Sequence, residues 1–590
     1  MCYNTGVWEG FPMRLNIIKS PNATSYYVIK DYKKNGKRST KVVEKLGTHV
    51  ELLEKCGDSD PVAWANAYIE ELNRKEKENE FEYVAKYSSA KMLSKDKQRL
   101  FKGGYLFVQS LFTQLGLPKI CQQIAKDYKI TYSLSDILNM LVTTRILDPA
   151  SKRSSLASAQ DCLEKPDIPL HHIYRALEVF AQNSDFLQAE LYRNSKKLAK
   201  RNDKILYYDC TNYYFEIEAE EGLKQYGKSK EHRPNPIVQM GLFMDADGLP
   251  LAFRLFNGNE NEQPSLKPLE EKILKDFNLS KFVVCTDAGL ASHENRLFNS
   301  EGERAYIVTQ SLKTLKQHLR DWALDPTGWQ LKHSTERYDI SQIDPADEAE
   351  LDRIYYKNRW IKEKGLEQQL IVTFSLKHRL YQQDLRARQI ERAQGKIAKP
   401  SSLERRNVND PARFVKRCSV TQEGELAEQD VYFLDTDGIA KEAQYDGFYG
   451  ICTNLDDDPL DILAVNRGRW EIESAFRIMK TELKARPVYL KRDDRIQAHF
   501  LSCFIALLIY RIMTKKIQTL LPEKPPSGEM IIKTLSQMNF LEKEGDGFIP
   551  TYTRTDITDA LHDAFGFRTD LELVPNREMR KIVNLTKTQK

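Results

Sequence analysis

An apolar run that ends in a single carboxylate is the feature that most constrains this 590-residue chain. Residues 204–211 read Lys-Ile-Leu-Tyr-Tyr-Asp-Cys-Thr, so that Asp209 follows four apolar or aromatic side chains. Short apolar runs that polar residues close are typical of buried strands. The sequence therefore predicts a strand whose end presents the Asp209 carboxylate to a cleft.

The order of elements after this strand narrows the fold class to α/β. Residues 237–256 indicate a hairpin around Asp-Ala-Asp-Gly, and a helix, a strand ending at Asp287, a second helix and a strand at 305–309 follow. This is the order of a ribonuclease H-like fold, in which Asp209 and Asp287 end the first and fourth strands. Either Asp alone is more often a turn former or a helix cap, but their places in one fold order favour a metal site.

A third carboxylate lies on a predicted amphipathic helix at 469–480. Apolar residues step along it by four, three and four positions and form a face that packs on the sheet: Ile472, Phe476, Met479 and Leu483. Glu473 shares a different face with three cations, Arg469, Arg477 and Lys480. The alternative is a salt-bridge ladder on the helix surface. Glu471 points about 200° away round the helix and is the weaker candidate.

About 130 residues separate the strand at 305–309 from this helix. A structureless loop of that length would count against a ribonuclease H-like fold. We therefore predict an inserted domain that is rich in β-strands. The predicted division is a small N-terminal β region at 1–60, a helical, DNA-binding domain at 61–200, a split catalytic domain at 201–312 and 446–520, an insertion domain at 313–445 and a C-terminal region at 521–590. We expect the last region to end in a surface tail.

Composition bounds the remaining choices. Charged residues make up 29% of the chain, and the apolar stretch at 500–510 is too short to span a membrane, so we expect a core helix there, with His499 as a satisfied core residue. Nine cysteines are spread singly and the N-terminus lacks a secretory pattern, which fits a cytoplasmic protein. Residues 377–417 hold 12 Lys/Arg against 4 Asp/Glu. That segment is either a phosphate-binding surface or a solvated helix and loop.

Five segments together resemble bacterial insertion-sequence transposases of the Asp-Asp-Glu (DDE) type, and in particular the insertion-sequence-four superfamily, which has an insertion domain before the glutamate. The resemblance covers residues 100 to 515 approximately, and its most specific motif places Tyr, Arg, Glu and Lys at relative positions 0, 3, 7 and 14. Asn466 stands at the Tyr position. The matching segments are Tyr208-Asp209-Cys210-Thr211, residues 227–234, Gly258-Asn259, Thr286-Asp287-Ala288-Gly289 and residues 469–480.

The residues permit cutting and joining of DNA. Two Mg²⁺ ions about 3.5–4 Å apart would activate an oxygen nucleophile and stabilise the leaving oxygen, with Mn²⁺ as a substitute. Asp209 would bridge the ions, and Asp287 and Glu473 would each help to hold one. Arg469, Lys480 and Arg477 would bind the phosphate backbone beside the scissile bond. Water as nucleophile hydrolyses the strand, and a 3′-hydroxyl joins it to target DNA.

The resemblance also implies partners. They are terminal inverted repeats and target DNA, bound by a homodimer in a synaptic complex, without a membrane, in the bacterial cytoplasm at the nucleoid. An insertion-domain Trp holds a flipped base in some members; here Trp360 is the candidate and Trp329 the second choice, although each is more often a core residue. A ribonuclease H-like nuclease without strand transfer and a catalytically inactive DNA-binding descendant remain alternatives.

Overall fold

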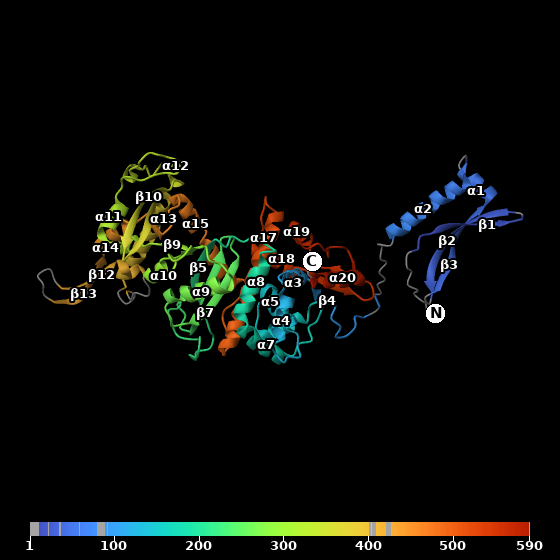
Figure 1. Ribbon diagram of the computed structural model, residues 1–590, viewed down its shortest axis with the longest axis horizontal. Helices are drawn as coiled ribbons and strands as arrows, with labels where there is room; N and C mark the ends of the chain where they lie inside the picture. Colours follow the sequence, from blue (N-terminus) through green and yellow to red (C-terminus); the bar gives the residue numbers. More distant parts are fainter. Residues whose placement is uncertain are drawn as a thin grey trace. The chain divides into compact units, whose positions relative to one another are not determined.

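The computed structural model describes residues 11–21, 23–34, 37–57, 60–79, 89–90, 92–399, 403, 409–420 and 426–588. The chain divides into two compact units, Met1–Lys97 and Gln98–Lys590. Figure 1 labels the elements of both units.

The first unit is a three-stranded antiparallel sheet with two helices. Its strands lie in the order β1 (Arg14–Ser20), β2 (Ala23–Lys34) and β3 (Lys37–Thr48), followed by α1 (His49–Cys56) and α2 (Pro61–Asn79). The helices pack on one face of the sheet around a core of Tyr26, Val28, Leu46, Leu52, Ala65 and Ile69. The strands confirm the sheet that the sequence predicts, and the Asn35-Gly36 turn lies outside the described residues. The unit also includes α2, which the predicted division assigned to the helical domain.

Helices dominate the start of the second unit, as apolar spacing predicted. They are α3 (Tyr105–Gln114), α4 (Leu117–Ala125), α5 (Leu134–Leu147), α6 (Lys152–Ala159), α7 (Leu170–Gln182) and α8 (Ser184–Ser195). Gly116 makes the turn between α3 and α4 at φ 73°, a conformation that suits glycine.

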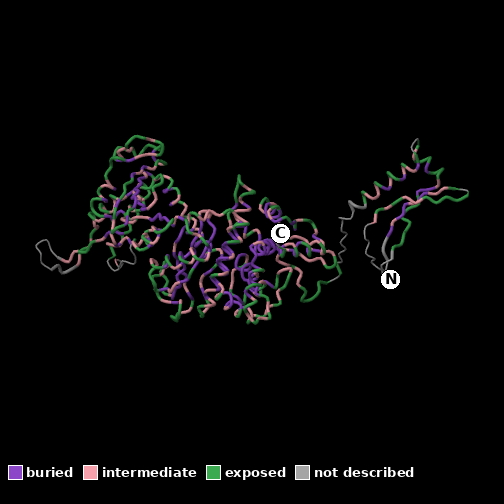
Figure 2. Tube along the Cα trace, viewed as in Figure 1, coloured by how far each residue is buried: buried purple, intermediate pink, exposed green. Residues whose placement is uncertain are grey.

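The long helix α17 (Asp493–Leu520) runs through the centre of this unit and contacts α5 and α7. By length and composition it could cross a membrane, but 89% of its most apolar window is buried inside the protein. Figure 2 shows the buried residues of the unit gathered along this helix and the neighbouring sheet. The predicted core helix is therefore confirmed. His499 on it is buried and hydrogen-bonded to the Ala485 carbonyl, 3.0 Å away.

An eight-stranded sheet forms the rest of the core, in the order β10-β11-β14-β9-β8-β5-β6-β7. β5 pairs in parallel with β8 and antiparallel with β6. The strands are β5 (Ile205–Tyr214), β6 (Ile237–Asp245), β7 (Pro250–Asn257), β8 (Val283–Thr286), β9 (Ala305–Thr309), β10 (Tyr355–Glu363), β11 (Leu366–Phe374) and β14 (Phe448–Thr453), with α9 (Leu266–Asp276) and α10 (His293–Phe298) between β7, β8 and β9. The fold is mixed α/β, as predicted.

Two strands of residues 313–445 belong to the main sheet. β10 pairs with β11, and β11 pairs with β14. A second, two-stranded sheet pairs β12 (Val415–Val420) with β13 (Leu426–Leu434). The helices of this region are α11 (Gln317–Leu324), α12 (Glu348–Leu351), α13 (Leu376–Ile397) and α14 (Thr436–Ala443). The region is thus continuous with the sheet that carries Asp209.

The helix that carries Glu473 was predicted to continue from about Asp458. The structure has two helices there, α15 (Pro459–Arg467) and α16 (Trp470–Thr481). The break falls at Gly468, where a Cβ atom would collide with the Tyr207 hydroxyl. That hydroxyl donates a hydrogen bond to the Val465 carbonyl, 3.0 Å away. Tyr207 on β5 therefore packs against the end of α15, and α16 starts afresh beside the sheet.

The expected surface tail is wrong. The C-terminal region contains α18 (Gly528–Gln537), β15 (Asn539–Lys543), β16 (Gly547–Pro550), α19 (Asp556–Phe565), β17 (Val574–Pro575) and α20 (Asn576–Thr586). Its strands form a sheet with β4 (Leu100–Lys102) in the order β17-β16-β15-β4. α20 buries Met579, Ile582 and Val583 and contacts α3. Their three-and-one spacing gives the basic tail an apolar face.

Candidate active site

Asp209 lies on β5, and Asp287 directly follows the neighbouring parallel strand β8. Tyr207 of β5 pairs with Cys285 of β8, and continuing this register by two residues places Asp287 opposite Asp209. Burial, together with the negative charge of Asp287, raises the pKa of the Asp209 carboxyl to about 6 although nearby cations lower it. The two carboxylates therefore share one site.

Each of these carboxylates also makes a local hydrogen bond. Asp209 Oδ1 accepts from the N–H of Cys210 at 2.7 Å, and Asp287 Oδ1 accepts from the N–H of Leu290 at 3.1 Å. Asp287 thus stabilises the turn after β8, as the alternative interpretation of a strand-end Asp expected. Oδ2 of neither carboxylate is used in these contacts.

Cations surround Asp209. Lys230 and Arg469 lower its pKa by their positive charge. Lys230 Nζ lies 2.6 Å from the Cys210 carbonyl and 2.8 Å from the carboxylate of Glu262. Lys480 lies in the same neighbourhood, since burial and the charge of Lys230 lower its pKa to about 8 while Asp209 raises it. The predicted residues Arg469 and Lys480 are thus both beside Asp209.

Lys230 is a site residue to which the sequence analysis assigned no role. It lies in an irregular segment between β5 and β6, within the matching segment 227–234, so that motif was the available signal. Glu231 next to it forms ion pairs with Lys480, at 3.2 Å, and with Arg486. These contacts fix the segment against the end of α16.

Glu473 is not gathered with the two aspartates. Its side chain is 67% exposed, and its Oε1 lies 3.9 Å from Arg469 Nη2. Among the described residues, no group of three His, Cys, Asp or Glu side chains is close enough to hold a metal ion. The assignment of Glu473 as the third metal ligand stays a prediction. Glu471 instead accepts a hydrogen bond from Arg511 on α17 at 3.0 Å.

The aspartate pair fits a divalent cation. Two carboxylates at one place repel each other, and the pKa of Asp209 is raised mainly by burial and also by the charge of Asp287. Hard divalent cations prefer carboxylate oxygens. A cation between Asp209 and Asp287 would therefore remove the electrostatic cost of placing them together.

Arg477 faces a different part of the surface from Lys480. It lines a cleft of about 1030 Å³ along α16, α17 and α18. Other cations and an exposed aromatic residue line the same cleft: Trp470, Lys484, Arg511, Lys515 and Lys533. The predicted single cationic face of α16 is therefore divided between Asp209 and this cleft.

The two tryptophan candidates differ in exposure. Trp329 is fully buried, and its indole N–H donates to the Asp325 carbonyl at 2.9 Å. Trp329 is therefore a core residue. Trp360 is 42% exposed on β10, at the edge of the main sheet. Trp360 is accessible to a ligand, and its contact with DNA stays a prediction.

The basic segment 377–417 uses much of its charge internally. Seven of its cations form ion pairs with acidic residues of the same region: Lys377, Arg386, Arg388, Lys396, Arg413, Lys416 and Arg417. This favours a structural interpretation of the segment over a dedicated phosphate-binding surface.

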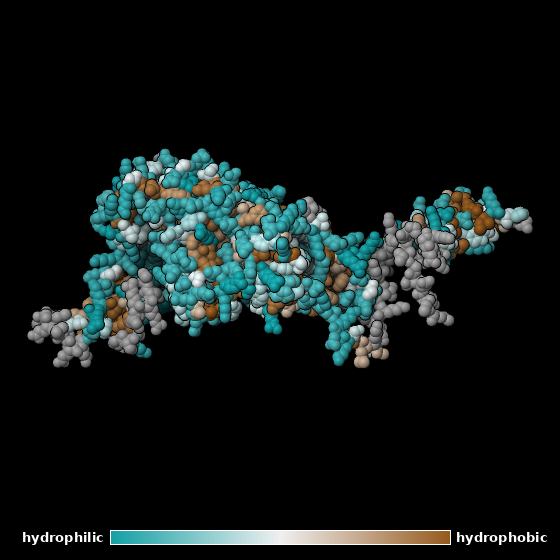
Figure 3. All heavy atoms as spheres, turned by 60° about the horizontal axis from the view of Figure 1, so that its bottom comes forward, coloured by the Kyte–Doolittle hydropathy of each residue, from teal (hydrophilic) through white to brown (hydrophobic). Residues whose placement is uncertain are grey.

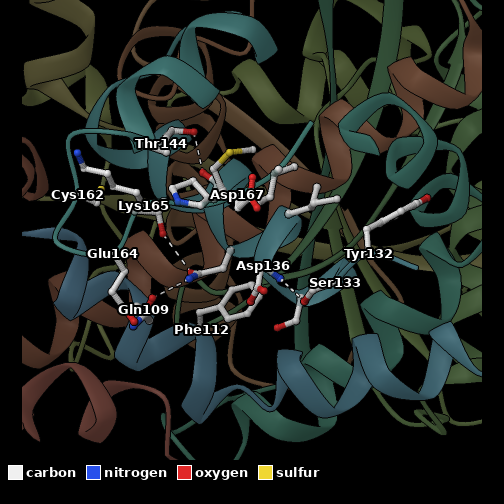
Figure 4. A pocket seen from close by; sticks show the side chains of 18 of the residues that line it. Gln109, Phe112, Tyr132, Ser133, Asp136, Thr144, Cys162, Glu164, Lys165 and Asp167 are labelled. Carbon is white, nitrogen blue, oxygen red and sulfur yellow. Dashed lines mark hydrogen bonds between the residues drawn. The ribbon is translucent and has the colours of Figure 1, made fainter. Parts of the chain in front are cut away.

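A cavity of about 770 Å³ lies among the helices α3 and α5 and the loop at 162–169. Figure 4 shows the polar side chains around it, including Gln109, Asp136 and Glu164. Lys587, just after α20, pairs with Glu164 at 2.6 Å. None of the predicted catalytic residues lines the cavity. It belongs to the scaffold that joins the helices to the C-terminal region.

Comparison with known proteins identifies the family. The family model described as "Transposase DDE domain" matches residues 214–509, which is half of the chain. The chain therefore belongs to the DDE transposase family and is a DNA transposase by this membership. The matched residues include Asp287 and Glu473, and Asp209 lies five residues before them.

Solved structures give weaker likenesses. A piggyBac transposase synaptic complex with hairpin DNA is 8% identical, with a TM-score of 0.36, covering 84% of this chain and 88% of that one. A Mos1 transposase paired-end complex with the left transposon end is 12% identical, with a TM-score of 0.13, covering 44% and 70%. At these scores neither adds to the family assignment. Comparison with curated proteins gives no match.

Proposed function

We propose that this transposase cleaves DNA at the ends of an insertion sequence and joins them to target DNA with divalent cations. The observation that carries the proposal is the electrostatic interaction of Asp209, on β5, with Asp287, directly after the parallel strand β8, beside Lys230, Arg469 and Lys480. Carboxylates can bind divalent metal ions, and neighbouring Lys and Arg side chains can bind phosphates. This combination suits the cleavage of phosphodiester bonds.

We also propose that the catalytic core is ribonuclease H-like. Numbered by their order in the chain, the five strands from β7 to β9 lie in the order 3-2-1-4-5. Only the second of these strands runs antiparallel to the central one where they pair, and the fourth runs parallel to it. The first and fourth strands carry Asp209 and Asp287, which supports the predicted fold.

In the proposed mechanism, Asp209 and Asp287 would hold Mg²⁺, and Glu473 from α16 would be the third ligand. Two bound Mg²⁺ ions, or Mn²⁺, would activate the attacking oxygen and stabilise the leaving oxygen. Asp209 and Asp287 orient the site because both are anchored by backbone N–H groups. Each is proposed to act as a carboxylate, so activity requires deprotonation of Asp209.

The cations supply phosphate binding. Arg469 and Lys480 are proposed to hold the DNA backbone next to the scissile bond, and Lys230 adds a further positive charge beside Asp209. Lys480, with a pKa of about 8, is mostly protonated at neutral pH and carries the required charge. Arg477 is proposed to bind DNA that leaves the site through the cleft along α16.

Partners are proposed from the family. DNA with terminal inverted repeats and target DNA are the substrates, a homodimer in a synaptic complex is the assembly, and the bacterial cytoplasm is the site of action. Trp360 is proposed to contact DNA because it is the exposed member of the tryptophan pair. The insertion-sequence-four superfamily remains the proposed subgroup.

The test uses purified protein, Mg²⁺, a labelled duplex with the inverted repeat that flanks its gene, and a supercoiled target plasmid. We expect nicking at the end of the repeat followed by strand joining. Asp209→Asn is expected to lower both by about 10³-fold or more, as loss of a central catalytic group does. Asp185→Asn, an exposed aspartate paired with Lys272, is the matched control and keeps activity.

Other outcomes select the alternatives. Cleavage without joining would identify a nuclease without strand transfer. Specific binding without cleavage would identify an inactive DNA-binding descendant. Cleavage that survives Asp209→Asn would show that the aspartate pair is not the active site.

A further inference from the structure

The first unit separates its charges between its sheet and its helices. Residues 14–48, which form the sheet, carry nine Lys/Arg and two Asp/Glu, a net charge of +7. Residues 49–79, which form the helices, carry four Lys/Arg and eight Asp/Glu, a net charge of −4. The helices cover one face of the sheet. The positive charge is thus carried by the element whose other face is left uncovered among the described residues.

Strand alternation defines the residues of this open face. Tyr26 and Val28 point to the helices, so Tyr27, Ile29 and Asp31 point away from them. Asp31 confirms this arrangement, because its partners come from the flanking strands on the same face. They are Arg14 on β1 at 3.3 Å and, on β3, Arg38 and Thr40, each at 2.7 Å.

Asp31 holds the two arginines in place without hiding them. Asp31 itself is only 3% exposed, whereas the side chains of Arg14 and Arg38 are 56% and 64% exposed. The Arg38 guanidinium also lies over the Phe11 ring, 4.8 Å from its centroid. Both guanidinium groups are therefore anchored while more than half of each arginine side chain stays exposed. A guanidinium group that is already oriented loses less conformational freedom when it binds a ligand.

The rest of the face adds a cation and apolar contacts. Lys45 is exposed and lies opposite Tyr27 in the β2–β3 register. Ile18 and Val42 on the flanking strands are each about half exposed. Figure 3 shows apolar atoms exposed among polar ones on this unit. The face is therefore a cationic surface with small apolar contacts, and among its described residues Asp31, paired with the two arginines, is the one carboxylate.

We propose that the open face of the β1-β2-β3 sheet binds duplex DNA, with Arg14 and Arg38 reading the major groove and Lys45 binding phosphate. A β-ribbon fits the major groove, guanidinium groups bind guanine edges in pairs of hydrogen bonds, and aliphatic side chains contact thymine methyl groups. The net charge of +7 is complementary to the DNA backbone. This inference rests on the proposed function, because it supplies the recognition surface for the DNA that the active site cuts.

The test compares two triple variants of the full chain that change charge equally. Arg14→Gln/Asp31→Asn/Arg38→Gln removes a carboxylate and its two cations from the sheet. Glu71→Gln/Arg74→Gln/Lys75→Gln removes a carboxylate and its two cations from α2, where Glu71 pairs with both. Fluorescence anisotropy with the inverted-repeat duplex and a shuffled duplex, over a range of salt concentrations, measures affinity.

We expect the sheet variant to lose about 10-fold or more in affinity for the repeat duplex, and its salt slope to fall by about 2. The helix variant should stay within about 2-fold of wild type, since it lies on the other side of the sheet. Lys45→Gln, which removes no buried partner, should weaken both duplexes about equally and lower the slope by about 1. Lys45→Gln keeps the test valid if the Arg14→Gln/Asp31→Asn/Arg38→Gln variant unfolds.

Failure of this inference can be told apart from failure of the proposed function. Mn²⁺-dependent nicking of plasmid at saturating protein should persist in the sheet variant and vanish in Asp209→Asn. A sheet variant and Lys45→Gln that both bind DNA like wild type would overturn the inference alone. A change in oligomeric state with unchanged DNA affinity would also overturn it, by assigning the face to a protein partner. Absence of DNA binding and nicking in wild type would instead contradict the proposed function.

Discussion

Two sheets in this molecule each place an aspartate on a central strand, and the two carboxylates have opposite electrostatics. Hydrogen bonds from Thr40, Arg38 and Arg14 hold the pKa of Asp31 well below its usual range. Burial and the neighbouring Asp287 raise the pKa of Asp209 to about 6. The partners of Asp31 outweigh the effect of its burial, whereas the cations beside Asp209 do not outweigh the effect of its burial and of Asp287.

The difference indicates what each carboxylate is for. A carboxylate saturated by its own chain organises its neighbours and needs no ligand. A carboxylate that is raised in pKa beside a second one is stabilised by a cation that the chain does not provide. The predictions below test this contrast, from the largest expected effect to the smallest.

Glu473→Gln should lower cleavage of the repeat duplex by at least about 10²-fold, because we propose it as the third ligand beside Asp209. Glu303→Gln is the matched control: its side chain is 65% exposed, like that of Glu473, and it pairs with a single cation, Lys281. Single-turnover cleavage rates measure both. Equal rates for Glu473→Gln and wild type would leave the site with two carboxylates and a ligand still to be found.

Mn²⁺ or Mg²⁺ should stabilise the second unit and leave the first unchanged. At a free cation concentration of 100 times Kd, binding to the native state contributes about 2.7 kcal/mol. Differential scanning calorimetry at constant ionic strength should therefore show a higher Tm for wild type and no shift for Asp209→Asn. A shift that persists in Asp209→Asn would place the cation elsewhere.

Without divalent cations, Asp209→Asn should stabilise the second unit at pH 7.5 and not at pH 4. The native carboxyl has a pKa of about 6, above its unfolded value, so folding binds protons and stability falls as pH rises from about 4 to 6. Asparagine avoids this cost, which is on the order of 1–3 kcal/mol above pH 6. Denaturant unfolding at both pH values measures it, and an equal effect at pH 4 would contradict the assigned cause.

Asp31→Asn should have the opposite sign and the smallest effect. Its pKa is lowered, so it stabilises the first unit above its unfolded pKa, and this contribution is lost as pH falls. The variant should open the first unit more often at pH 7, with less difference from wild type near pH 3. Amide hydrogen exchange resolved to β2 measures this, and equal protection at pH 7 would show that Asp31 does not hold the arginines.

Local patterns predicted most of the fold between residues 204 and 310. Strand alternation, the Asp-Gly turn and the helical spacing of 266–276 are all short-range signals, and the observed elements follow them. The break at Gly468 was missed because its cause, the hydroxyl of Tyr207, is distant in sequence. The same holds for β11, whose pairing with β14 no local pattern encodes.

Local patterns also predicted part of the candidate site. The element order implied that Asp209 and Asp287 come from neighbouring parallel strands, and β5 and β8 do pair in parallel. The prediction that Asp209 ends its strand was wrong, because β5 continues to Tyr214, whereas Asp287 does directly follow β8. Arg469 and Lys480 followed from helical spacing. Lys230 was not assigned a role, since an irregular segment gives no periodicity from which to place a side chain. Arg477 was misplaced because small rotations decide which of two neighbouring surfaces a helix residue faces.

The continuity of the main sheet through β9, β14, β11 and β10 limits how this protein can change over evolution. Residues 313–445 cannot be exchanged between relatives as a cassette, because their removal would strip β14 of its partner along positions 448–453 and leave a bare edge. Bare edges recruit other strands and aggregate. A shorter descendant would have to gain a new cover for β14, or lose β14 and gain a new cover for β9. β14 therefore depends on residues 313–445 to cover one of its edges.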